Sequence, residues 1–350
     1  MNRPDSLRIS FLNKKNGSIL IYVLWLSALL GLFTLSIGYT VRQKLKLIER
    51  IDTRRSLRLA AESGAQRGLW AIHRPMAEEK KADALNSVWS HDDVTFNDVE
   101  FEQTRLSVEK SGAGQAPAEI RFGLVDEESK VNINLLKDAE ILKQLALNGA
   151  QTTEEEAGII SDAVLDWIDV DDHVNASGAE NQYYRGLKRA LTPKNAPLDS
   201  LEELLYVRGF TPAIYQLLAP YLTLYGDGKI NLNTAAKTVL LSIGLESAAV
   251  DFILNYRAGV DQKIGTRDDG IFYNPEELVT DAQGSGALSA DSIDRLNQFL
   301  SRGILKVSSD YFEVQSKVSR KNGQDLLVSR AVISRQFGIQ SWNEVNTQNA

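Results

Sequence analysis

The sequence contains no cysteine and only three histidines among its 350 residues. Without cysteine the chain can form no disulfide framework, no thiol nucleophile and no thiolate metal site. This absence is compatible with an oxidising compartment but does not prove one. The histidines, His73, His91 and His173, are not spaced as metal ligands. The sequence also lacks a Ser-His-Asp pattern, a glycine-rich phosphate loop and a zinc motif, so catalytic chemistry that depends on such groups is poorly supplied.

The chain also lacks an excess of basic residues. Lys and Arg number 39 against 46 Asp and Glu, which gives a formal net charge of -7. A broad nucleic-acid-binding surface needs clustered Lys and Arg. The acidic balance therefore argues against such a surface, while the length allows two or three domains.

What the sequence does contain is a long uncharged run. From Ser18 to Val41 no residue is charged, and most are Leu, Ile, Val, Phe, Trp or Ala. About 20 apolar residues cross a bilayer as a helix, and a buried core helix is rarely uncharged for so long. The run also exceeds the ~7–15 apolar residues of a secretory signal. We therefore expect residues 18–41 to form a transmembrane helix.

Basic residues flank this run on both sides. Four precede it, against a single Asp5, and this excess would keep the N-terminus in the cytoplasm. Three more follow it directly, so charge alone leaves the orientation open. The basic residues in question are Arg3, Arg8, Lys14 and Lys15 before the run, and Arg42, Lys44 and Lys46 after it.

The sequence after the expected transmembrane segment predicts one long helix and then strands. In residues 42–72, apolar or small residues recur at steps of three and four, which is the helical period. Pro75 is expected to end this helix. Strand-like segments follow at 99–101, 106–108 and 120–124, with a Gly/Ala/Pro linker from Gly112 to Pro117.

Residues 135–302 are mostly helical in pattern, and the C-terminal part returns to strands. Helices are expected near 154–168, 201–206, 235–243, 247–256 and 289–300. Alternating segments at 311–319 and 326–334 flank Asn322-Gly323, a strong hairpin signal. The layout suggests a helical domain inserted into an α+β domain, followed by a polar, frayed tail from Asn343.

Several motifs resemble the K-type minor pseudopilins of type II secretion systems. Lys14-Lys15-Asn16-Gly17 resembles a type IV prepilin leader, with the cut between Gly17 and Ser18. In the central block, Asp166-Trp167-Ile168-Asp169 with Gly178-Ala179-Glu180 is the most specific match and distinguishes the K type from other pilin-like chains. The remaining matches are Leu24 to Leu26, Leu59 to Trp70, Asp126 to Asn134, Tyr183-Tyr184 and Asn195 to Gly209.

The resemblance implies an α+β, pilin-like fold with a long N-terminal membrane helix and a small antiparallel sheet, interrupted by a large inserted all-α domain. The implied segments are a leader (1–17), the transmembrane helix (18–41), the pilin-like helix and first strands (42–125), the inserted domain with helix-hairpin-helix-like units (126–302), the C-terminal strands (303–340) and a tail (341–350).

The same resemblance implies a structural role without enzymatic activity. Such proteins join the I- and J-type minor pseudopilins at the tip of the periplasmic pseudopilus and support secretion across the outer membrane. Prepilin peptidase and the major pseudopilin are further implied partners. The implied location is the inner membrane, crossed once, with the N-terminus in the cytoplasm and the bulk of the chain in the periplasm.

One position departs from ordinary pilins. With Ser18 counted first, the fifth residue is Tyr22, where major pilins carry Glu and K-type members do not. A carboxylate buried in a fibre needs a partner, and the resemblance suggests that this partner is the N-terminal amine of the subunit above. Because Tyr22 offers no such charge, we expect this chain at the tip of the fibre and not along its shaft.

An acidic loop is the candidate metal site. Asp169, Asp171 and Asp172 cluster near Glu180, and carboxylates that converge without Lys or Arg repel one another unless a cation lies between them. This is no EF-hand, because glycine is missing at the sixth position. The spacing alone also fits a solvated loop that caps the next helix. The resemblance, whose helical domain binds calcium, favours a structural Ca²⁺ ion. Asp268-Asp269-Gly270 reads as a turn.

Residues 230–257 and 274–278 resemble helix-hairpin-helix DNA-binding modules. Such modules present backbone amides to phosphate, but Glu246 places a negative charge in the hairpin. We therefore expect a helical packing unit and no nucleic-acid partner. Two other functions stay open: a membrane-anchored DNA-uptake receptor and a minor pilin of a true type IV pilus. The inserted block argues against the second.

Overall fold

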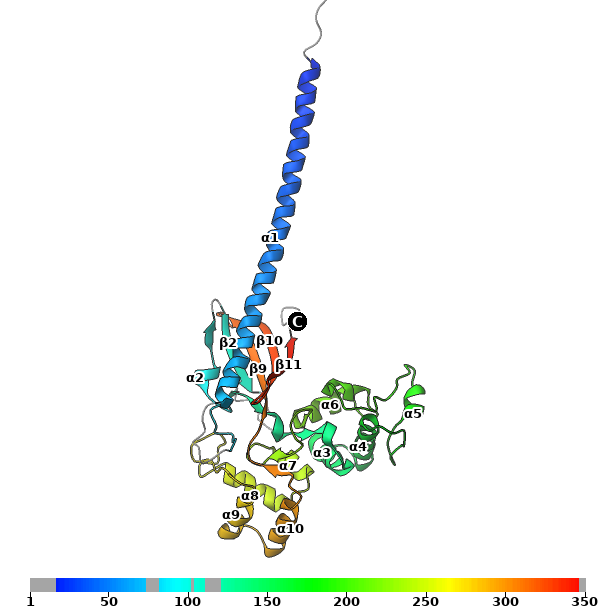
Figure 1. Cartoon of the computed structure of the whole chain (residues 1–350), viewed down its shortest axis with the longest axis vertical. Coiled ribbons are helices and arrows are strands. Elements are labelled where there is room, and N and C mark those ends of the chain that lie inside the picture. Colours follow the sequence, from blue (N-terminus) through cyan, green and yellow to red (C-terminus); the bar gives the residue numbers. More distant parts are fainter. Residues whose placement is uncertain (1–16, 74–81, 102–103, 111–120, 346–350) are drawn as a thin grey trace, which may run out of the picture. The chain divides into compact units, whose positions relative to one another are not determined.

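The computed structural model in Figure 1 describes residues 17–73, 82–101, 104–110 and 121–345. By contacts the chain divides into two compact units, residues 1–56 and 57–350. Helix α1 (Gly17–His73) belongs to both, as one continuous helix of 57 residues. The expected leader up to Asn16 and the linker from Gly112 to Pro117 lie outside the described residues.

The described part of the first unit is α1 up to Ser56, and it begins with the apolar run. In the described part of the chain, α1 is the one helix long and apolar enough to cross a membrane. Its side chains from Ile19 to Val41 are exposed, as no core helix of a soluble protein would be. Thr34 and Thr40 donate hydroxyl hydrogen bonds to the carbonyls four residues earlier, which satisfies these polar groups within an apolar medium. The helix therefore fits a single-pass membrane anchor.

The second unit contains an antiparallel sheet in the order β1-β2-β9-β10-β11. Its strands are β1 (Val99–Phe101), β2 (Thr104–Lys110), β9 (Tyr311–Arg320), β10 (Asp325–Ser334) and β11 (Gly338–Val345). Two short strands, β3 (Arg121–Phe122) and β4 (Val125–Asp126), pair with β2 and β9. The expected Asn-Gly hairpin joins β9 to β10, with Gly323 at φ 86. Helix α2 (Asp93–Phe96) precedes β1.

The C-terminal part of α1, from Leu57 on, packs on this sheet through small residues. Ala60, Ala61 and Ala65 are fully buried, and a Cβ atom at Gly64 would collide with the hydroxyl of Ser316 on β9. Strand β9 alternates buried and half-buried side chains, as a strand with one face on a helix must. The α+β, pilin-like class expected from the sequence is confirmed by this arrangement (Figure 1).

The C-terminal end differs from the expectation. Residues 343–345 were expected to fray, but β11 continues to Val345 and pairs with β10 as far as Val328. Trp342 packs against the core beneath the sheet. Its ring N–H donates to Glu344 at 2.9 Å. Because Gln340, Ser341, Asn343 and Glu344 of β11 are polar, this edge strand has the composition of a tail, and the sequence prediction was wrong there.

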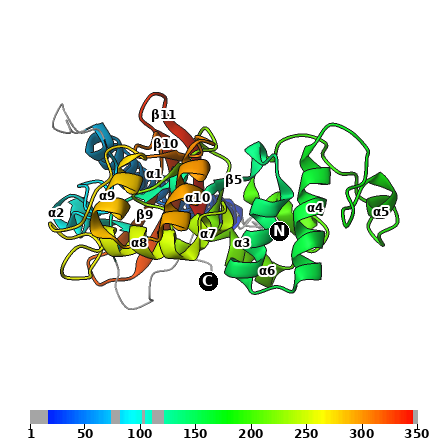
Figure 2. The same ribbon diagram turned by 90° about the horizontal axis from the view of Figure 1, so that it is seen from below.

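The block between β4 and β9 has its own core, built from apolar residues between Val131 and Leu305. Its helical elements are η1 (Glu127–Ser129), η2 (Ile133–Leu135), α3 (Ala139–Ala150), α4 (Glu154–Ile168), α5 (Asn181–Arg185), η3 (Leu201–Tyr206), α6 (Pro212–Leu218), η4 (Ala219–Tyr221), α7 (Lys237–Ser242), α8 (Ser247–Arg257), α9 (Glu277–Ser285) and α10 (Ala290–Leu300). Figure 2 shows α3, α4 and α6 as one group and α8, α9 and α10 as another.

This block is not purely helical, in contrast to the expected all-α insert. It contains two short parallel strand pairs: β5 (Val131–Asn132) with β6 (Leu222–Thr223), and β7 (Ile230–Asn231) with β8 (Leu305–Lys306). Strands of two residues leave almost no periodic signal in a sequence. The second pair brings the two ends of the α7–α10 segment together.

Buried polar side chains join the block to the sheet at Asp126, the last residue of β4. One carboxylate oxygen of Asp126 accepts hydrogen bonds from Asn231 Nδ2 (3.0 Å), Thr234 Oγ1 (2.6 Å) and Ser309 Oγ (2.7 Å). The other accepts from the backbone N–H of Glu128 at 2.8 Å. These residues come from the beginning, the middle and the end of the block, so the cluster fixes where the chain leaves the sheet and where it returns.

None of the four donors to Asp126 is a cation, and its side chain is 3% exposed. Burial raises the pKa of this carboxyl from 3.8 to about 6; hydrogen bonds from Thr234 and Ser309 oppose the rise, and the neighbouring Asp83 adds to it. A pKa higher in the folded than in the unfolded state means that folding favours the protonated form. The resulting stabilisation is full below about pH 4 and is lost as the pH rises through about 6.

We predict that Asp126→Asn removes this pH dependence. Between pH 4 and 7 the free energy of unfolding of the wild type should fall relative to that of the variant by about 2–3 kcal/mol, from the size of the pKa shift. Urea unfolding of residues 42–350 at several pH values measures this difference. The control, Asp291→Asn at an exposed site of α10, should show no such trend. If the free energies of unfolding of Asp126→Asn and the wild type differ by a constant amount between pH 4 and 7, the prediction is contradicted.

Candidate functional site

The acidic loop lies between two helices whose ends it completes. Helix α4 begins with a capping box of Thr153 and Glu156 and ends at Ile168, so Asp169 is its C-terminal cap. Helix α5 begins after Glu180, whose carboxylate accepts from the N–H of Asn181. The sequence thus places one predicted metal ligand at each end of a loop of about a dozen residues.

Two carboxylates of α4 hold the loop in place. Asp166, fully buried, accepts from the backbone N–H of Asn175 at 3.1 Å, and Asp162 accepts from that of Ser177 at 2.8 Å. Only glycine fits at position 178, because a Cβ atom there would collide with the carboxylate of Asp166. Asp166 and Gly178 of the sequence motif therefore shape the loop.

Four oxygen atoms at this loop are buried and accept no hydrogen bond: Asp169 Oδ1, Glu180 Oε1, Asn181 Oδ1 and Asn195 Oδ1. Buried polar atoms almost always have a partner, and an orphaned one destabilises the fold. Burial raises the pKa of Asp169, and Asp171 and Asp166 add to the rise. Burial also raises the pKa of Glu180, with further contributions from Asp166, Asp169 and Asp172. The loop therefore concentrates negative charge around unpaired oxygens.

The other two predicted ligands are already engaged. Asp171 Oδ1 accepts from the backbone N–H of His173 at 2.8 Å and lies 3.0 Å from its Nδ1. Asp172 Oδ1 accepts from the amide nitrogens of Asn181 (2.8 Å) and Asn195 (3.3 Å). Asp172 thereby orients both amide groups whose oxygens remain unpaired.

Within the described ranges, no three Asp, Glu or His side chains lie close enough to hold a metal ion by themselves. The set of Asp169, Asp171, Asp172 and Glu180 therefore stays a prediction. The unpaired oxygens indicate a different set, in which Asn181 and Asn195 replace Asp171 and Asp172. The sequence did not predict Asn195 as a ligand, because this residue lies well after the acidic loop in the chain. Its backbone has a φ of 46, a conformation that Asn tolerates well, so the residue type does not mark it as a ligand.

The unpaired atoms fit calcium. All four are oxygens, two from carboxylates and two from amides, and Ca²⁺ binds 6–8 oxygen ligands of these types in irregular loops. The ion would supply positive charge at these oxygens, in addition to that of Arg208, whose Nη1 donates to the backbone carbonyl of Gly178 at 2.8 Å. Backbone carbonyls and water are the usual remaining ligands of such sites.

We predict that calcium raises the melting temperature of residues 42–350 relative to a chelator, because a ligand of the native state stabilises it by mass action, by about 2.7 kcal/mol at 100 times Kd. Glu180→Gln and Asn195→Ala should each weaken the shift. Glu155→Gln, an exposed carboxylate on α4, should keep it in full. Identical melting curves with calcium and with chelator would count against the site.

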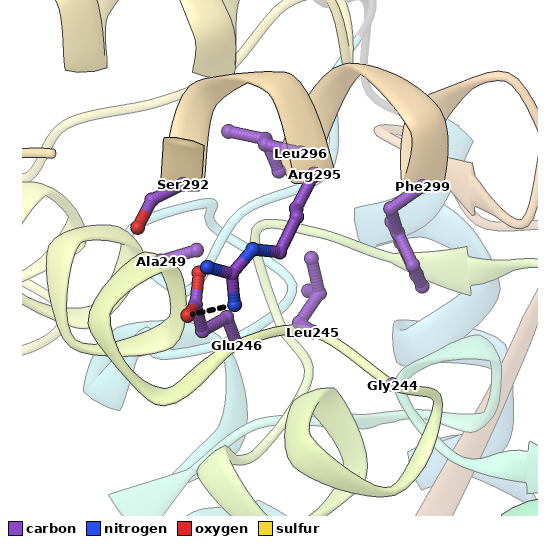
Figure 3. A pocket seen from close by; sticks show the side chains of 8 residues that line it. All are labelled: Gly244, Leu245, Glu246, Ala249, Ser292, Arg295, Leu296 and Phe299. Carbon is purple, nitrogen blue, oxygen red and sulfur yellow. Dashed lines mark hydrogen bonds and ion pairs between the residues drawn. The ribbon is translucent and has the colours of Figure 1, made fainter. Parts of the chain in front are cut away.

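The second candidate is the hairpin between α7 and α8, where Gly244 has φ 98. A pocket of 230 Å³ lies between this hairpin and α10 (Figure 3). Glu246 faces into it and forms an ion pair with Arg295 Nη1 at 2.9 Å. The pocket is lined by Gly244, Leu245, Glu246, Ala249, Ser292, Arg295, Leu296 and Phe299. The carboxylate of Glu246 in the hairpin would repel a phosphate group, and its ion pair occupies the guanidinium of Arg295.

The arginine within the helix-hairpin-helix-like segment is also engaged internally. Arg257 is 4% exposed and donates to the backbone carbonyl of Ala235 at 2.6 Å. Burial lowers its pKa to about 10. Its guanidinium thus holds the segment before α7 in place and cannot reach a phosphate in solvent. Both observations favour a packing unit over a nucleic-acid interface.

The remaining predicted positions lie on α1. Gly17 is the first described residue of the helix, and Ser18 follows it. The side chain of Tyr22 is 72% exposed. The apolar run around it, residues 18–41, contains no charged residue that would neutralise a carboxylate at this position.

Known proteins match this chain in sequence and in fold. Residues 128–227 match the family model described as type II secretion system (T2SS), protein K. A type II secretion system protein K of Aeromonas hydrophila is 28% identical over 181 residues, 50% of this chain and 48% of its own length. That of Pectobacterium carotovorum subsp. carotovorum is 34% identical over 112 residues, 31% of this chain and 34% of its own. The chain thus spans half or less of these curated relatives.

A solved structure extends the match over most of the chain. A chain from the crystal structure of the GspK-GspI-GspJ complex of the enterotoxigenic Escherichia coli type 2 secretion system aligns with a TM-score of 0.61 at 16% identity. The alignment covers 86% of this chain and 100% of that one. At this identity the likeness establishes the fold alone.

Proposed function

We propose that this chain, a member of the protein K family of type II secretion systems, is the minor pseudopilin that caps the periplasmic pseudopilus with I- and J-type pseudopilins and so supports secretion across the outer membrane. One observation carries the proposal. The segment that matches the family, residues 128–227, falls in the block inserted between β4 and β9 of a pilin-like sheet.

The tip position is supported by Tyr22. A buried carboxylate near the start of the helix would need a positive partner, which the next subunit of a fibre can provide through its N-terminal amine. Tyr22 is neutral and exposed on α1, so this chain offers no charged contact to a subunit above it. The terminal subunit needs no such contact.

The inserted block supports the same position. It has a hydrophobic core of its own and is joined to the sheet through the buried cluster around Asp126. A block of this size, fixed at both ends, adds bulk to every copy of the subunit. Such bulk is accommodated at an end of a fibre more readily than in a repeating shaft.

The proposed setting is the inner membrane, crossed once by residues 18–41, with the N-terminus in the cytoplasm and the remaining residues in the periplasm. Prepilin peptidase would cut between Gly17 and Ser18, and the major pseudopilin would form the shaft below. Calcium would stabilise the loop between Asp169 and Glu180. The chain would carry out no reaction and bind no nucleic acid, in keeping with the ion pair of Glu246 and Arg295 in the hairpin.

We predict that the full chain in detergent co-purifies with the I- and J-type pseudopilins of its own system as a stable complex. The matched control is the minor pilins of a type IV pilus, which should not be retained. Size-exclusion chromatography with light scattering measures the composition. Retention of the type IV minor pilins, with no association with the I and J types, would overturn the proposal and favour a true pilus subunit.

A further inference from the structure

Basic side chains crowd the part of α1 that follows the apolar run. Six of residues 42–55 are Lys or Arg and only two are acidic, although the whole chain is acidic. All six are exposed. The basic residues are Arg42, Lys44, Lys46, Arg50, Arg54 and Arg55, and the acidic ones are Glu49 and Asp52.

These six charges have no carboxylate partner within the described part of the chain. The next basic residue on the helix, Arg58, differs: its Nε lies 2.8 Å from Glu62 and 3.6 Å from Glu344. Protein carboxylates therefore compensate the arginine next to the sheet, but not those nearer the apolar run. The six basic residues nearer the run are therefore available to an anion outside the described part of the chain.

Their positions indicate which anion is near. Arg42 directly follows Val41, the end of the uncharged run. At 1.5 Å per residue, Arg42, Lys44 and Lys46 lie within about 8 Å of that end, measured along the axis. This distance equals about one Debye length at physiological salt, and a headgroup layer is roughly 5–8 Å deep on each side of the bilayer. The other three basic residues begin about 14 Å from the run.

The three near residues also surround the helix. With 3.6 residues per turn, Arg42 and Lys46 lie on one side and Lys44 on the opposite side. A protein partner would occupy one face, whereas lipid headgroups surround a helix that leaves a bilayer. No acidic residue separates these three from the apolar run, because the first, Glu49, comes after them.

We propose that Arg42, Lys44 and Lys46 bind the phosphate groups of anionic phospholipids at the membrane surface from which α1 emerges. This rests on the proposed single-pass insertion of residues 18–41. The contacts fix the depth of the helix in the bilayer. They also oppose removal of the subunit from the membrane, so assembly into a fibre must replace lipid phosphates by other anions or by solvent.

The test uses the full chain in phosphatidylcholine vesicles that contain a small fraction of spin-labelled phosphatidylglycerol or spin-labelled phosphatidylcholine. Electron paramagnetic resonance reports the share of each labelled lipid that the protein immobilises. The near variant, Arg42→Gln/Lys44→Gln/Lys46→Gln, is compared with the far variant, Arg50→Gln/Arg54→Gln/Arg55→Gln, which loses the same charge. The basic residues before the span are unchanged in both, so their contribution cancels.

The near variant should lower the preference for phosphatidylglycerol about fivefold or more, the effect of at least one basic residue at an anionic surface. The far variant should lower it less than about twofold, because its charges lie beyond one Debye length. In 1 M salt the wild-type preference should shrink. Equal losses in both variants, or no preference in the wild type, would overturn the inference.

Resistance to carbonate extraction from the same vesicles measures insertion separately. A wild-type chain that is extracted would contradict the membrane anchor, and with it the proposed function. If the chain stays inserted but immobilises labelled phosphatidylglycerol and phosphatidylcholine to the same extent, only the lipid contacts of Arg42, Lys44 and Lys46 are contradicted.

Discussion

The close contact between the small-residue face of α1 and the sheet is the interaction on which the rest of the structure depends. Ala60, Ala61, Gly64 and Ala65 let the helix approach β9 so closely that Gly64 has no room for a side chain. The same helix continues without a break into the apolar run. One element therefore fits a membrane anchor at its N-terminal end and contributes Leu57, Ala60, Ala61, Ala65, Ala71 and Ile72 to the core beneath the sheet at its other end.

The inserted block builds on that scaffold without disturbing it. Its core is separate, and its connection to the sheet is polar: Asp126 gathers donors from three distant parts of the chain. A buried carboxylate without a cation costs stability, so this cluster is better suited to fixing one geometry than to maximising stability. The cluster thereby connects the segment that matches the protein K family to a pilin-like sheet, whose strands lie before and after that segment in the sequence.

Much of this could be predicted from the sequence where the pattern is long. The uncharged run, the helix at 154–168 and the β9–β10 hairpin each repeat one period over many residues. The errors have the opposite cause: strand β11 is half polar in composition, and β5 to β8 are too short to show a period. At the acidic loop, Asp169 and Glu180 have unpaired oxygens, but Asn195 joins them only through the fold, and Asp172 turned out to orient the amides.

The proposed tip position rests on two separate features, the missing charge at Tyr22 and the bulk of the block, and it can be tested by direct observation. Because the chain has no cysteine, Gln298→Cys on the exposed side of α10 gives a single labelling site. Electron microscopy of gold-labelled pseudopili should show the label at one end of each fibre. Label at regular intervals along the shaft would contradict the placement of this subunit at the tip.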